Sequence, residues 1–334
     1  MSGTVVDRYD LVVLDLDGVV YLGEQPIPGA APAVSALLDR GKPVIFATNN
    51  ASRTPAEVAT LLVGLGVPAT ADQVFTSAQA SARELARRLP AGSPVLVVGA
   101  PALATEVTAV GLRPVYRAAD DPVAVVQGYA ADVGWSHLAE ACLAVRAGAL
   151  WLATNVDRTL PSPRGPLPGN GSLVAALATA LGRQPDAVVG KPGPDLFARA
   201  AEQAGARDAL VVGDRLDTDM VGAARAGMDR LLVLTGVASA ADLLLAPADQ
   251  RPTHVGADLG ALSMVDCELR VPSAVDSGWR VRRDGNELLL SGQGDAVAAL
   301  RALCTASWAG TPTATVTATT PEAKAALTAL GLTG

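Results

Sequence analysis

Four short segments of the chain gather residue types that could act on a phosphate ester. They are DLDGVVYLG (15–23), ATNN (47–50), GKPGP (190–194) and GDRLDTD (213–219). Each lies at the end of a short apolar run that is typical of a strand buried on both faces. In open α/β sheets, ligands bind beyond the carboxyl ends of the strands, so the pattern predicts a ligand site at that edge of a sheet.

The small number of histidines excludes several kinds of catalytic site. Only His137 and His254 are present, and neither lies in the context of a serine hydrolase triad, a zinc-protease helix or a histidine phosphotransfer site. We therefore expect both histidines to be structural. Carboxylates accompanied by so few histidines favour a hard, oxygen-seeking cation such as Mg²⁺.

The carboxylates can be given roles from phosphate chemistry. A phosphate monoester is a dianion, so a carboxylate attacks its phosphorus only where cations remove the repulsion. Asp15 is placed as the nucleophile, and Asp17 as the acid that protonates the leaving oxygen and then activates water. Asp15, Asp214 and the backbone carbonyl of Asp17 are the expected Mg²⁺ ligands. Asp219 is expected to orient a metal-bound water or Lys191.

Lys191 is one of only three lysines in the chain, so its segment does not reflect lysine abundance. We expect it to hold the transferred phosphoryl group and to offset the carboxylates. Simpler roles remain open for the other residues. Asp214 and Asp219 could be ordinary turn and helix-start carboxylates, and Thr48 could be a turn hydroxyl.

The elements that must position these residues alternate between strand and helix. The pattern predicts a doubly wound α/β sheet with parallel strands, interrupted by a second α/β series that begins near residue 93. We expect a core made of residues 1–91 and 188–264, and an inserted domain at 92–187. The Pro- and Gly-rich stretch 156–172 is expected to be a shaped surface loop.

The tail, residues 265–334, shows a different pattern. Asp-Gly between two alternating runs in 278–292 is a strong hairpin signal, and a helix, a strand-like run and a second helix follow. We expect a small α+β module with a hydrophobic pattern of its own.

Together the four segments resemble those of the haloacid dehalogenase superfamily, in the branch that carries a C2-type cap domain. The longer stretches ATNVDRTLPSPRGPLPGNGS (153–172) and GDRLDTD are similar to those of its 4-nitrophenylphosphatase, phosphoglycolate and glycerol-3-phosphate phosphatase subgroup. The resemblance covers roughly residues 9–260. It implies that the inserted domain is the cap, and that Thr48 and the backbone amide of Asn49 bind the phosphoryl oxygens. Asn155 and Arg158 would either face the substrate or stabilise the cap loop.

The resemblance implies a Mg²⁺-dependent phosphatase with an aspartyl-phosphate intermediate on Asp15. We expect a small phosphate monoester as substrate, first of all glycerol 3-phosphate, with 2-phosphoglycolate as the alternative. A phosphotransferase or mutase of the same fold, or a sensor of phosphorylated metabolites, remains open. The tail resembles half of a GNAT acetyltransferase, although the glycine-rich loop of that family is not evident, and a docking or dimerisation role is preferred.

Composition excludes other classes of function. A net charge of -7 and an isoelectric point of about 4.9 argue against nucleic-acid binding, which requires clustered Lys and Arg. No apolar run is long enough to span a bilayer, so we expect no membrane partner and a cytoplasmic location. Capped relatives often pair through the cap, which allows a homodimer.

The four tryptophans, Trp135, Trp151, Trp279 and Trp308, are expected to be buried in hydrophobic cores as anchors.

Overall fold

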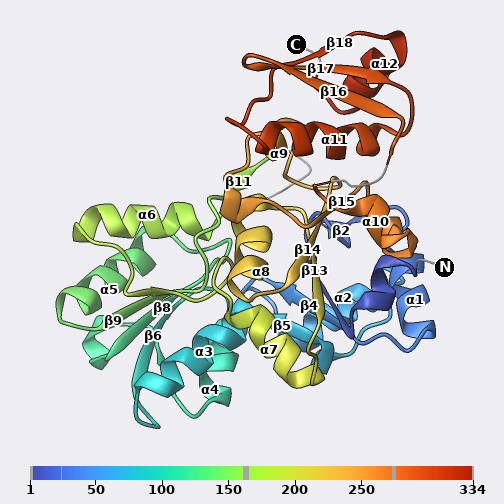
Figure 1. Ribbon diagram of the computed structural model, residues 1–334. Helices are drawn as coiled ribbons and strands as arrows, with labels where there is room; N and C mark the ends of the chain where they lie inside the picture. Colours follow the sequence, from blue (N-terminus) through green and yellow to red (C-terminus); the bar gives the residue numbers. More distant parts are fainter. Residues whose placement is uncertain (1–2, 24, 161–164, 273–275, 333–334) are drawn as a thin grey trace. The chain divides into compact units, whose positions relative to one another are not determined.

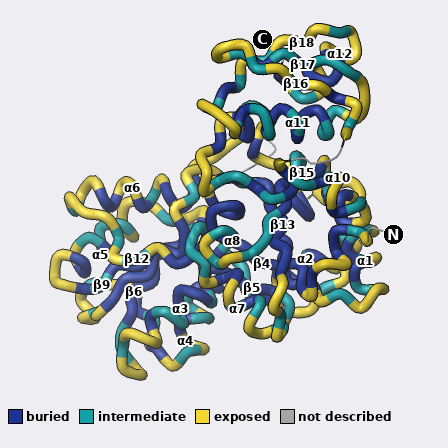
Figure 2. Tube along the Cα trace, viewed as in Figure 1, coloured by how far each residue is buried: buried dark blue, intermediate teal, exposed yellow. Residues whose placement is uncertain are grey.

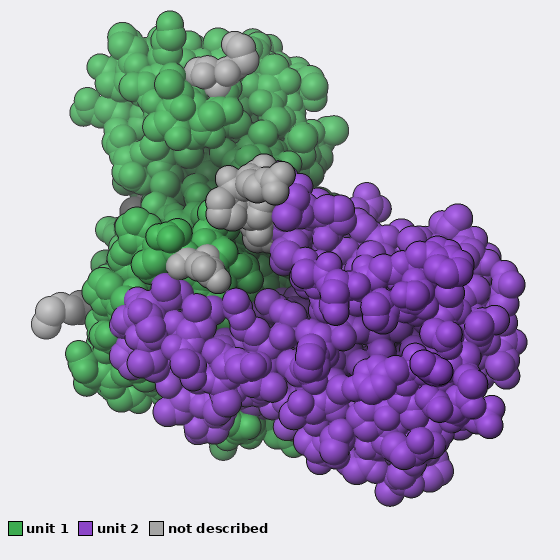
Figure 3. Space-filling model, turned by 180° about the vertical axis from the view of Figure 1, so that it is seen from behind, with its two compact units in different colours: residues 1–45, 201–334 green, residues 46–200 purple. Residues whose placement is uncertain are grey.

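The computed structural model describes residues 3–23, 25–160, 165–272 and 276–332. Its described part forms two compact units: unit 1 comprises residues 1–45 and 201–334, and unit 2 comprises residues 46–200 (Figure 3). Unit 2 therefore contains all of the inserted domain expected at 92–187, together with residues on both sides of it.

Unit 1 is built on parallel strands in the order β15-β14-β13-β1 (Figure 1). All four residues of β1 are buried, as expected of a continuous apolar run covered on both faces. The amide of Val12 in β1 donates to the carbonyl of Pro43 (3.1 Å), directly before β4 begins. The strands of unit 1 are β1 (Leu11–Leu14), β13 (Ala209–Gly213), β14 (Asp229–Val233) and β15 (His254–Gly256). The next strand in the chain, β4 (Val44–Thr48), has its first two residues in unit 1 and its last three in unit 2.

Helices alternate with the strands of this sheet along the chain. They are α1 (Ala30–Asp39), α8 (Val221–Arg225), α9 (Ala240–Leu244) and α10 (Asp266–Leu269), and a two-residue pair, β2 (Tyr21–Leu22) with β3 (Gln25–Pro26), follows β1. Helix α9 spans only five residues and was not predicted from the sequence. Strand–helix alternation with parallel pairing confirms the predicted α/β class.

Unit 2 contains a five-stranded parallel sheet in the order β12-β9-β8-β6-β7 and the parallel pair β4-β5. Figure 2 shows the strands of this sheet, such as β6, as buried and much of the surrounding helices as exposed. The strands are β5 (Val74–Thr76), β6 (Pro94–Val98), β7 (Arg113–Val115), β8 (Ala124–Gln127), β9 (Leu150–Ala153) and β12 (Ala187–Val188). The helices are α2 (Pro55–Gly64), α3 (Ser77–Arg88), α4 (Pro101–Ala109), α5 (Trp135–Arg146) and α6 (Asn170–Leu181). Helix α7 (Asp195–Ala204) begins in unit 2, and its residues from 201 on belong to unit 1.

The stretch expected as a surface loop, residues 156–172, holds short regular elements. β10 (Thr159–Leu160) pairs antiparallel with β11 (Leu167–Pro168), and residues 161–164 lie outside the described part. Helix α6 begins at Asn170, inside the stretch expected to be a loop. Asn170 is buried, and its side chain donates to the carbonyl of Asn155 (2.7 Å). A tertiary contact therefore lengthens the helix into the polar stretch.

The tail forms the expected hairpin and helices. Residues 276–332 are called the C-terminal module of unit 1. β16 (Trp279–Asp284) pairs antiparallel with β17 (Glu287–Gly292), and β17 pairs parallel with β18 (Val316–Ala318). The helices are α11 (Ala296–Trp308) and α12 (Pro321–Ala329). In Figure 1, α11 lies between this small sheet and α9.

The apolar core of the module is continuous with that of the main sheet. One cluster of buried side chains includes Leu232 of β14, Leu243 of α9, Leu300 of α11 and Leu288 of β17. The sequence pattern indicated a separate core, because a hydrophobic period shows which face of a helix is buried and not what it packs against.

The tryptophans do not all anchor cores. Trp151 and Trp279 are buried and Trp308 is half-buried, but Trp135 is 84% exposed, so its expected core position is wrong. It is the first residue of α5, and the buried face of that helix is formed by Ala141, Ala144 and Val145. The helical period of 3.6 residues places Trp135 away from this face.

Candidate active site

Three buried carboxylates form an acidic cluster in unit 1. Asp15 follows β1, and Asp214 and Asp219 follow β13, the strand that pairs with β1. One carboxylate oxygen from each lies within 4.8 Å of the other two, and the three residues are 8%, 1% and 1% exposed. The expectation that these residues meet at one edge of the sheet holds for all three.

The turn after β1 orients the first two aspartates. The amide of Asp15 donates to the carbonyl of Val212 in β13 (2.9 Å), so Asp15 still belongs to the sheet. Gly18 then reverses the chain with φ +83°, and its amide donates to the carbonyl of Tyr21 (2.7 Å). A Cβ on Gly18 would lie 2.4 Å from Oδ2 of Asp214. Glycine is therefore required both for the turn and for the approach of Asp214. Asp17, within the turn, is half-buried.

Asp214 is held by a segment that the sequence analysis missed, residues 235–238 at the end of β14. The amide of Val237 donates to Oδ2 of Asp214 (2.7 Å), and the hydroxyl of Thr235 donates to the carbonyl of Gly18 (2.6 Å). A Cβ on Gly236 would lie 1.9 Å from the same Oδ2, so only glycine fits. The available signal was a Thr-Gly pair directly after a strand of the same sheet.

Asp219 reaches the cluster through a π-helical turn, Leu216–Met220. Its Oδ2 accepts a hydrogen bond from the amide of Arg215 (3.2 Å), four residues earlier in the chain. Turns of this kind are frequent at functional sites. We expected Asp219 to orient a water or Lys191, and the structure places its carboxylate beside those of Asp15 and Asp214.

The acidic cluster fits Mg²⁺. Its donors are all carboxylate oxygens, which suit a hard cation, and three ionised carboxylates this close together repel one another unless a cation lies among them. Mg²⁺ uses few protein ligands and keeps several waters, so two or three carboxylates and one backbone carbonyl are enough. The predicted carbonyl ligand, that of Asp17, lies in the turn next to Asp15.

A second group of predicted residues lies in unit 2. Thr48 ends β4, and its side-chain oxygen accepts a hydrogen bond from the amide of Asn50 (3.1 Å), as a turn hydroxyl does. Lys191 is 2% exposed, and its ammonium lies 5.5 Å from the centre of the Phe197 ring. A lysine so deeply buried requires a compensating environment, which favours a specific role for it.

Asn49 joins Thr48 to Lys191. Its side-chain Oδ1 accepts from the amide of Lys191 (2.7 Å), and its Nδ2 donates to the carbonyl of Lys191 (3.1 Å) and to Oδ2 of Asp157 (3.0 Å). The backbone carbonyl of Asn49 accepts from the hydroxyl of Ser77 (2.6 Å) and the side chain of Asn155 (2.7 Å). Sequence reasoning assigned only the backbone amide of Asn49 and missed the role of its side chain.

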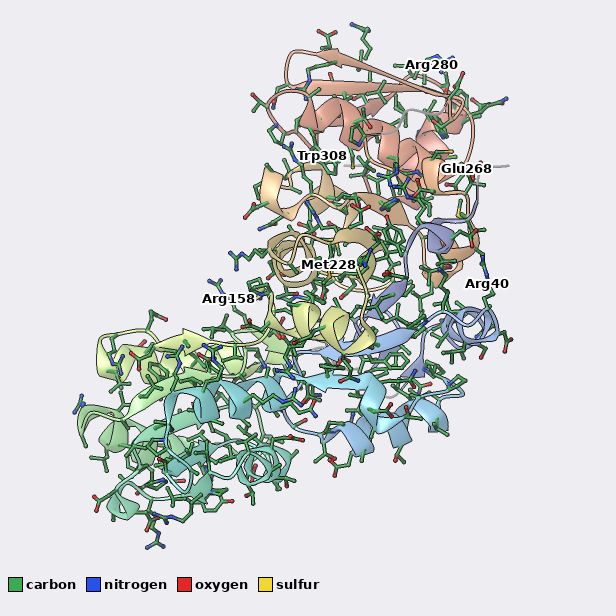
Figure 4. The ribbon with its side chains drawn as sticks, turned by 60° about the horizontal axis from the view of Figure 1, so that its bottom comes forward. Arg40, Arg158, Met228, Glu268, Arg280 and Trp308 are labelled. Carbon is green, nitrogen blue, oxygen red and sulfur yellow. The ribbon has the colours of Figure 1, made fainter. Side chains whose placement is uncertain are left out.

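The two cap residues differ in their surroundings. Asn155 is buried; its Nδ2 donates to Asn49, and its Oδ1 accepts from the amide of Asp157 (3.2 Å). These contacts favour loop stabilisation over substrate contact. Arg158 is exposed, and its carbonyl accepts from the amide of Gly169 (2.9 Å); Figure 4 labels its side chain.

Both histidines have structural partners. The ring of His137 accepts from the amide of Gly134 (3.2 Å) at the start of α5. His254 is fully buried, and its ring nitrogens contact the hydroxyl of Thr253 (2.8 Å) and the carboxylate of Asp266 (3.1 Å).

Family models match most of the chain. A haloacid dehalogenase-like hydrolase model matches residues 12–113, and a second model, of HAD-hydrolase-like proteins, matches residues 188–262. A model of a GCN5-related N-acetyltransferase like domain matches residues 276–332. The third match agrees with the resemblance noted for the tail.

Known proteins are similar to the chain over most of its length. A D-glycerol 3-phosphate phosphatase of Mycobacterium tuberculosis is 51% identical over 292 residues, which are 87% of this chain and 81% of that protein. A 5'-nucleotidase of Bacillus subtilis is 39% identical over 74% of this chain and 94% of its own length.

Solved structures show the same fold. The glycerol phosphate phosphatase of Mycobacterium tuberculosis in complex with magnesium matches with a TM-score of 0.92 at 47% identity, covering 100% of both chains. The 4-nitrophenylphosphatase of Thermotoga maritima matches with a TM-score of 0.71 at 33% identity, over 77% of this chain and 97% of its own. The family models, the 51% identical relative and the shared fold show that the chain belongs to the haloacid dehalogenase-like hydrolases.

Proposed function

We propose that this protein is a Mg²⁺-dependent phosphatase that hydrolyses a small phosphate monoester, with glycerol 3-phosphate as its main substrate. The observation that carries the proposal is the buried cluster of Asp15, Asp214 and Asp219 at the carboxyl ends of β1 and β13. The substrate is supported by the 51% identity to a D-glycerol 3-phosphate phosphatase.

In the first step, a carboxylate oxygen of Asp15 attacks phosphorus. The bond between phosphorus and the alcohol oxygen breaks, and Asp17 gives that oxygen its proton, so the alcohol leaves and an aspartyl-phosphate remains. Bound Mg²⁺ supplies positive charge that reduces the repulsion between the two anions and stabilises the charge on the phosphoryl oxygens.

In the second step, Asp17 is the base. Its carboxylate takes a proton from water, the water oxygen attacks phosphorus, and the bond to Asp15 breaks. Inorganic phosphate leaves, and both aspartates return to their initial protonation states. The half-buried position of Asp17, two residues beyond the nucleophile, suits a group that must reach both alcohol and water.

The residues of unit 2 are proposed to bind the same phosphoryl group. Thr48 and the amide of Asn49 would donate hydrogen bonds to its oxygens, and Lys191 would contribute its positive charge. Thr48 can do this while it accepts from Asn50, because a hydroxyl that accepts one hydrogen bond still has its own proton to donate. The burial of Lys191 supports this role.

We also propose that residues 92–187 are a C2-type cap that excludes water and selects the alcohol, and that residues 1–91 and 188–264 form the catalytic core. A cap over the site favours small substrates. The cytoplasmic location and the homodimer inferred from the sequence stay predictions, which cell fractionation and the mass in solution test.

The test is phosphate release from a panel of monoesters with Mg²⁺ and no acceptor alcohol. We expect the highest kcat/KM for glycerol 3-phosphate, above 2-phosphoglycolate and nucleoside monophosphates. A phosphotransferase would require an acceptor, and a sensor would bind without turnover. A preference for another ester would overturn the substrate and leave the reaction class in place.

A further inference from the structure

Residues 235–238, here called the clasp, contact both stretches of chain that carry the acidic cluster. The hydroxyl of Thr235 reaches the carbonyl of Gly18 (2.6 Å), and the amide of Val237 reaches Oδ2 of Asp214 (2.7 Å). The amide of Ala238 also donates to the backbone carbonyl of Asp214 (3.0 Å). Three hydrogen bonds from four consecutive residues thus hold the ends of two neighbouring strands.

We propose that the clasp positions the ligands of the Mg²⁺ site, and that helix α11 of the C-terminal module holds the clasp in place. The inference rests on the proposed Mg²⁺-dependent function. It assigns Thr235 as a positioning residue and gives the GNAT-like module a role within its own chain.

The contact of Thr235 bears on the predicted carbonyl ligand. The amide of Gly18 is bonded to the carbonyl of Tyr21 and the carbonyl of Gly18 to Thr235, so Gly18 is held on both sides. The planar peptide between Asp17 and Gly18 contains both the Gly18 amide and the Asp17 carbonyl. Fixing Gly18 therefore fixes the direction of the carbonyl that would bind the cation.

Helix α9 connects the clasp to the module. It begins two residues after the clasp, and Ser239 caps its start by accepting from the amide of Asp242 (3.1 Å). The carbonyls of its last two residues, Leu243 and Leu244, both accept from side chains of α11, and that of Leu243 also accepts from the amide of Ala246 (3.2 Å). The indole of Trp308 donates to the carbonyl of Leu243 (3.2 Å). The hydroxyl of Ser307 donates to the carbonyl of Leu244 (2.9 Å). Figure 4 labels Trp308 in unit 1.

Packing makes this connection stiff. Leu243 and Leu244 of α9 are fully buried in the same cluster as Leu300 and Leu303 of α11. The guanidinium of Arg251 lies 5.2 Å from the centre of the Trp308 ring. Close-packed side chains transmit a displacement to their neighbours, so a shift of α11 reaches α9 and the clasp.

The clasp is tested with Thr235→Val, which removes the hydroxyl and keeps the shape. The control is Thr179→Val, which removes a similar bond from a hydroxyl to the carbonyl of Ala175 (2.8 Å) within α6. Isothermal titration calorimetry on the full chain, without substrate, gives the Kd for Mg²⁺. We expect Thr235→Val to raise this Kd about fivefold, and Thr179→Val and the hydroxyl-retaining Thr235→Ser to leave it unchanged.

The module is tested with Trp308→Phe, and Trp279→Phe is its matched control. Each removes one indole donor to a backbone carbonyl, because the indole of Trp279 donates to Asp295 (2.9 Å), but only Trp308 reaches α9. Both changes should lower the thermal midpoint. Only Trp308→Phe should raise the Kd for Mg²⁺, by about twofold or more, since its effect on the clasp is indirect.

The results distinguish a failure of this inference from a failure of the proposed function. If the wild-type chain binds no Mg²⁺, the metal centre of the proposed function fails and the inference fails with it. If the wild type binds Mg²⁺ and Thr235→Val binds it equally well, the clasp is wrong and the proposed function stands. Equal Kd values for Trp308→Phe and Trp279→Phe would overturn the role of the module. Thr235→Ala replaces Thr235→Val if the latter does not fold.

Discussion

The side-chain amide of Asn49 hydrogen-bonds both the backbone amide and the backbone carbonyl of Lys191, 142 residues further along the chain. This pair of contacts fixes the backbone from which the lysine side chain extends. Asp157 and Asn155 in turn hold Asn49, so the chain that follows β9 is linked to the proposed phosphate-binding lysine.

Asn49→Ala should lower kcat/KM by about tenfold to a hundredfold, because two hydrogen bonds that position Lys191 are lost. Asn49→Asp should be at least as damaging, since its second oxygen would face the carbonyl of Lys191 and the carboxylate of Asp157. Steady-state kinetics over a range of substrate concentrations measures kcat/KM for both variants.

Asp10→Ala is the control, because Asp10 likewise bonds two distant backbone amides, those of Arg207 and Asp208, away from the predicted residues. An equal loss of kcat/KM in Asp10→Ala would reduce the effect to general destabilisation.

Asp15→Asn should abolish turnover, because an amide does not attack phosphorus. The fold should persist, since Asn is nearly the same shape and the backbone bond from Asp15 to Val212 remains. Phosphate release and circular dichroism on the same sample test this. Wild-type kcat in a folded Asp15→Asn protein would disprove the nucleophile.

Chelation should remove activity and Mg²⁺ should restore it, because the three carboxylates repel the substrate phosphate without a cation. Ca²⁺ should inhibit, since its larger and more flexible coordination misaligns Asp15 for attack. Activity is measured after EDTA treatment and during titration with each metal. Full turnover in excess EDTA would contradict the role assigned to Asp15 and Asp214.

Removal of residues 265–334 should lower thermal stability sharply, because the apolar cluster shared by α9 and α11 would face water. All the proposed catalytic residues precede residue 220, so kcat at saturating Mg²⁺ should survive in whatever fraction folds. Turnover, thermal midpoint and solution mass of one truncated protein test this. A folded truncated protein that is inactive even at saturating Mg²⁺ would show that the module completes the site.

Stability should fall as the pH drops below about 6.5, the ordinary pKa of histidine. Burial lowers the pKa of His254, so in that range the unfolded chain binds a proton that the folded chain does not. Burial raises the pKa of Asp266, but the hydrogen bonds from Arg270 and His254, together with the positive charge of Arg270, leave it lowered. The stability that Asp266 contributes is therefore lost only at more acidic pH. Urea unfolding at a series of pH values between 5 and 8 gives the free energy of unfolding at each pH. This free energy should change less with pH in His254→Gln than in the wild type. Identical changes with pH in the two proteins would show that another group titrates.

Much of the fold could be read from local patterns. The runs that became β1, β4 and β13 are continuously apolar, because strands covered on both faces need no polar side, and their ends mark where polar residues gather. The hairpin of β16 and β17 follows from Asp-Gly between alternating runs. Family resemblance and carboxylate chemistry together indicated the phosphatase class.

Long-range partners could not be read in this way. Nothing near Thr235 in the sequence indicates Gly18, which is 217 residues away, and the short helix α9 has too few residues to show a period. The exposure of Trp135 depends on which face of α5 is buried, and the shared core of α9 and α11 depends on which apolar faces meet.

The strands of the main sheet and the family could be predicted from the sequence, because a buried strand shows as a local apolar run and the family shows in the residue types of four short segments. Three contacts became visible only in the folded chain: residues 235–238 hold Asp214, the side chain of Asn49 holds Lys191, and the module packs onto α9. The physical reason is that a hydrogen bond or an apolar contact between distant residues requires a specific distance and direction, and chain folding sets these without leaving a pattern in the neighbouring sequence.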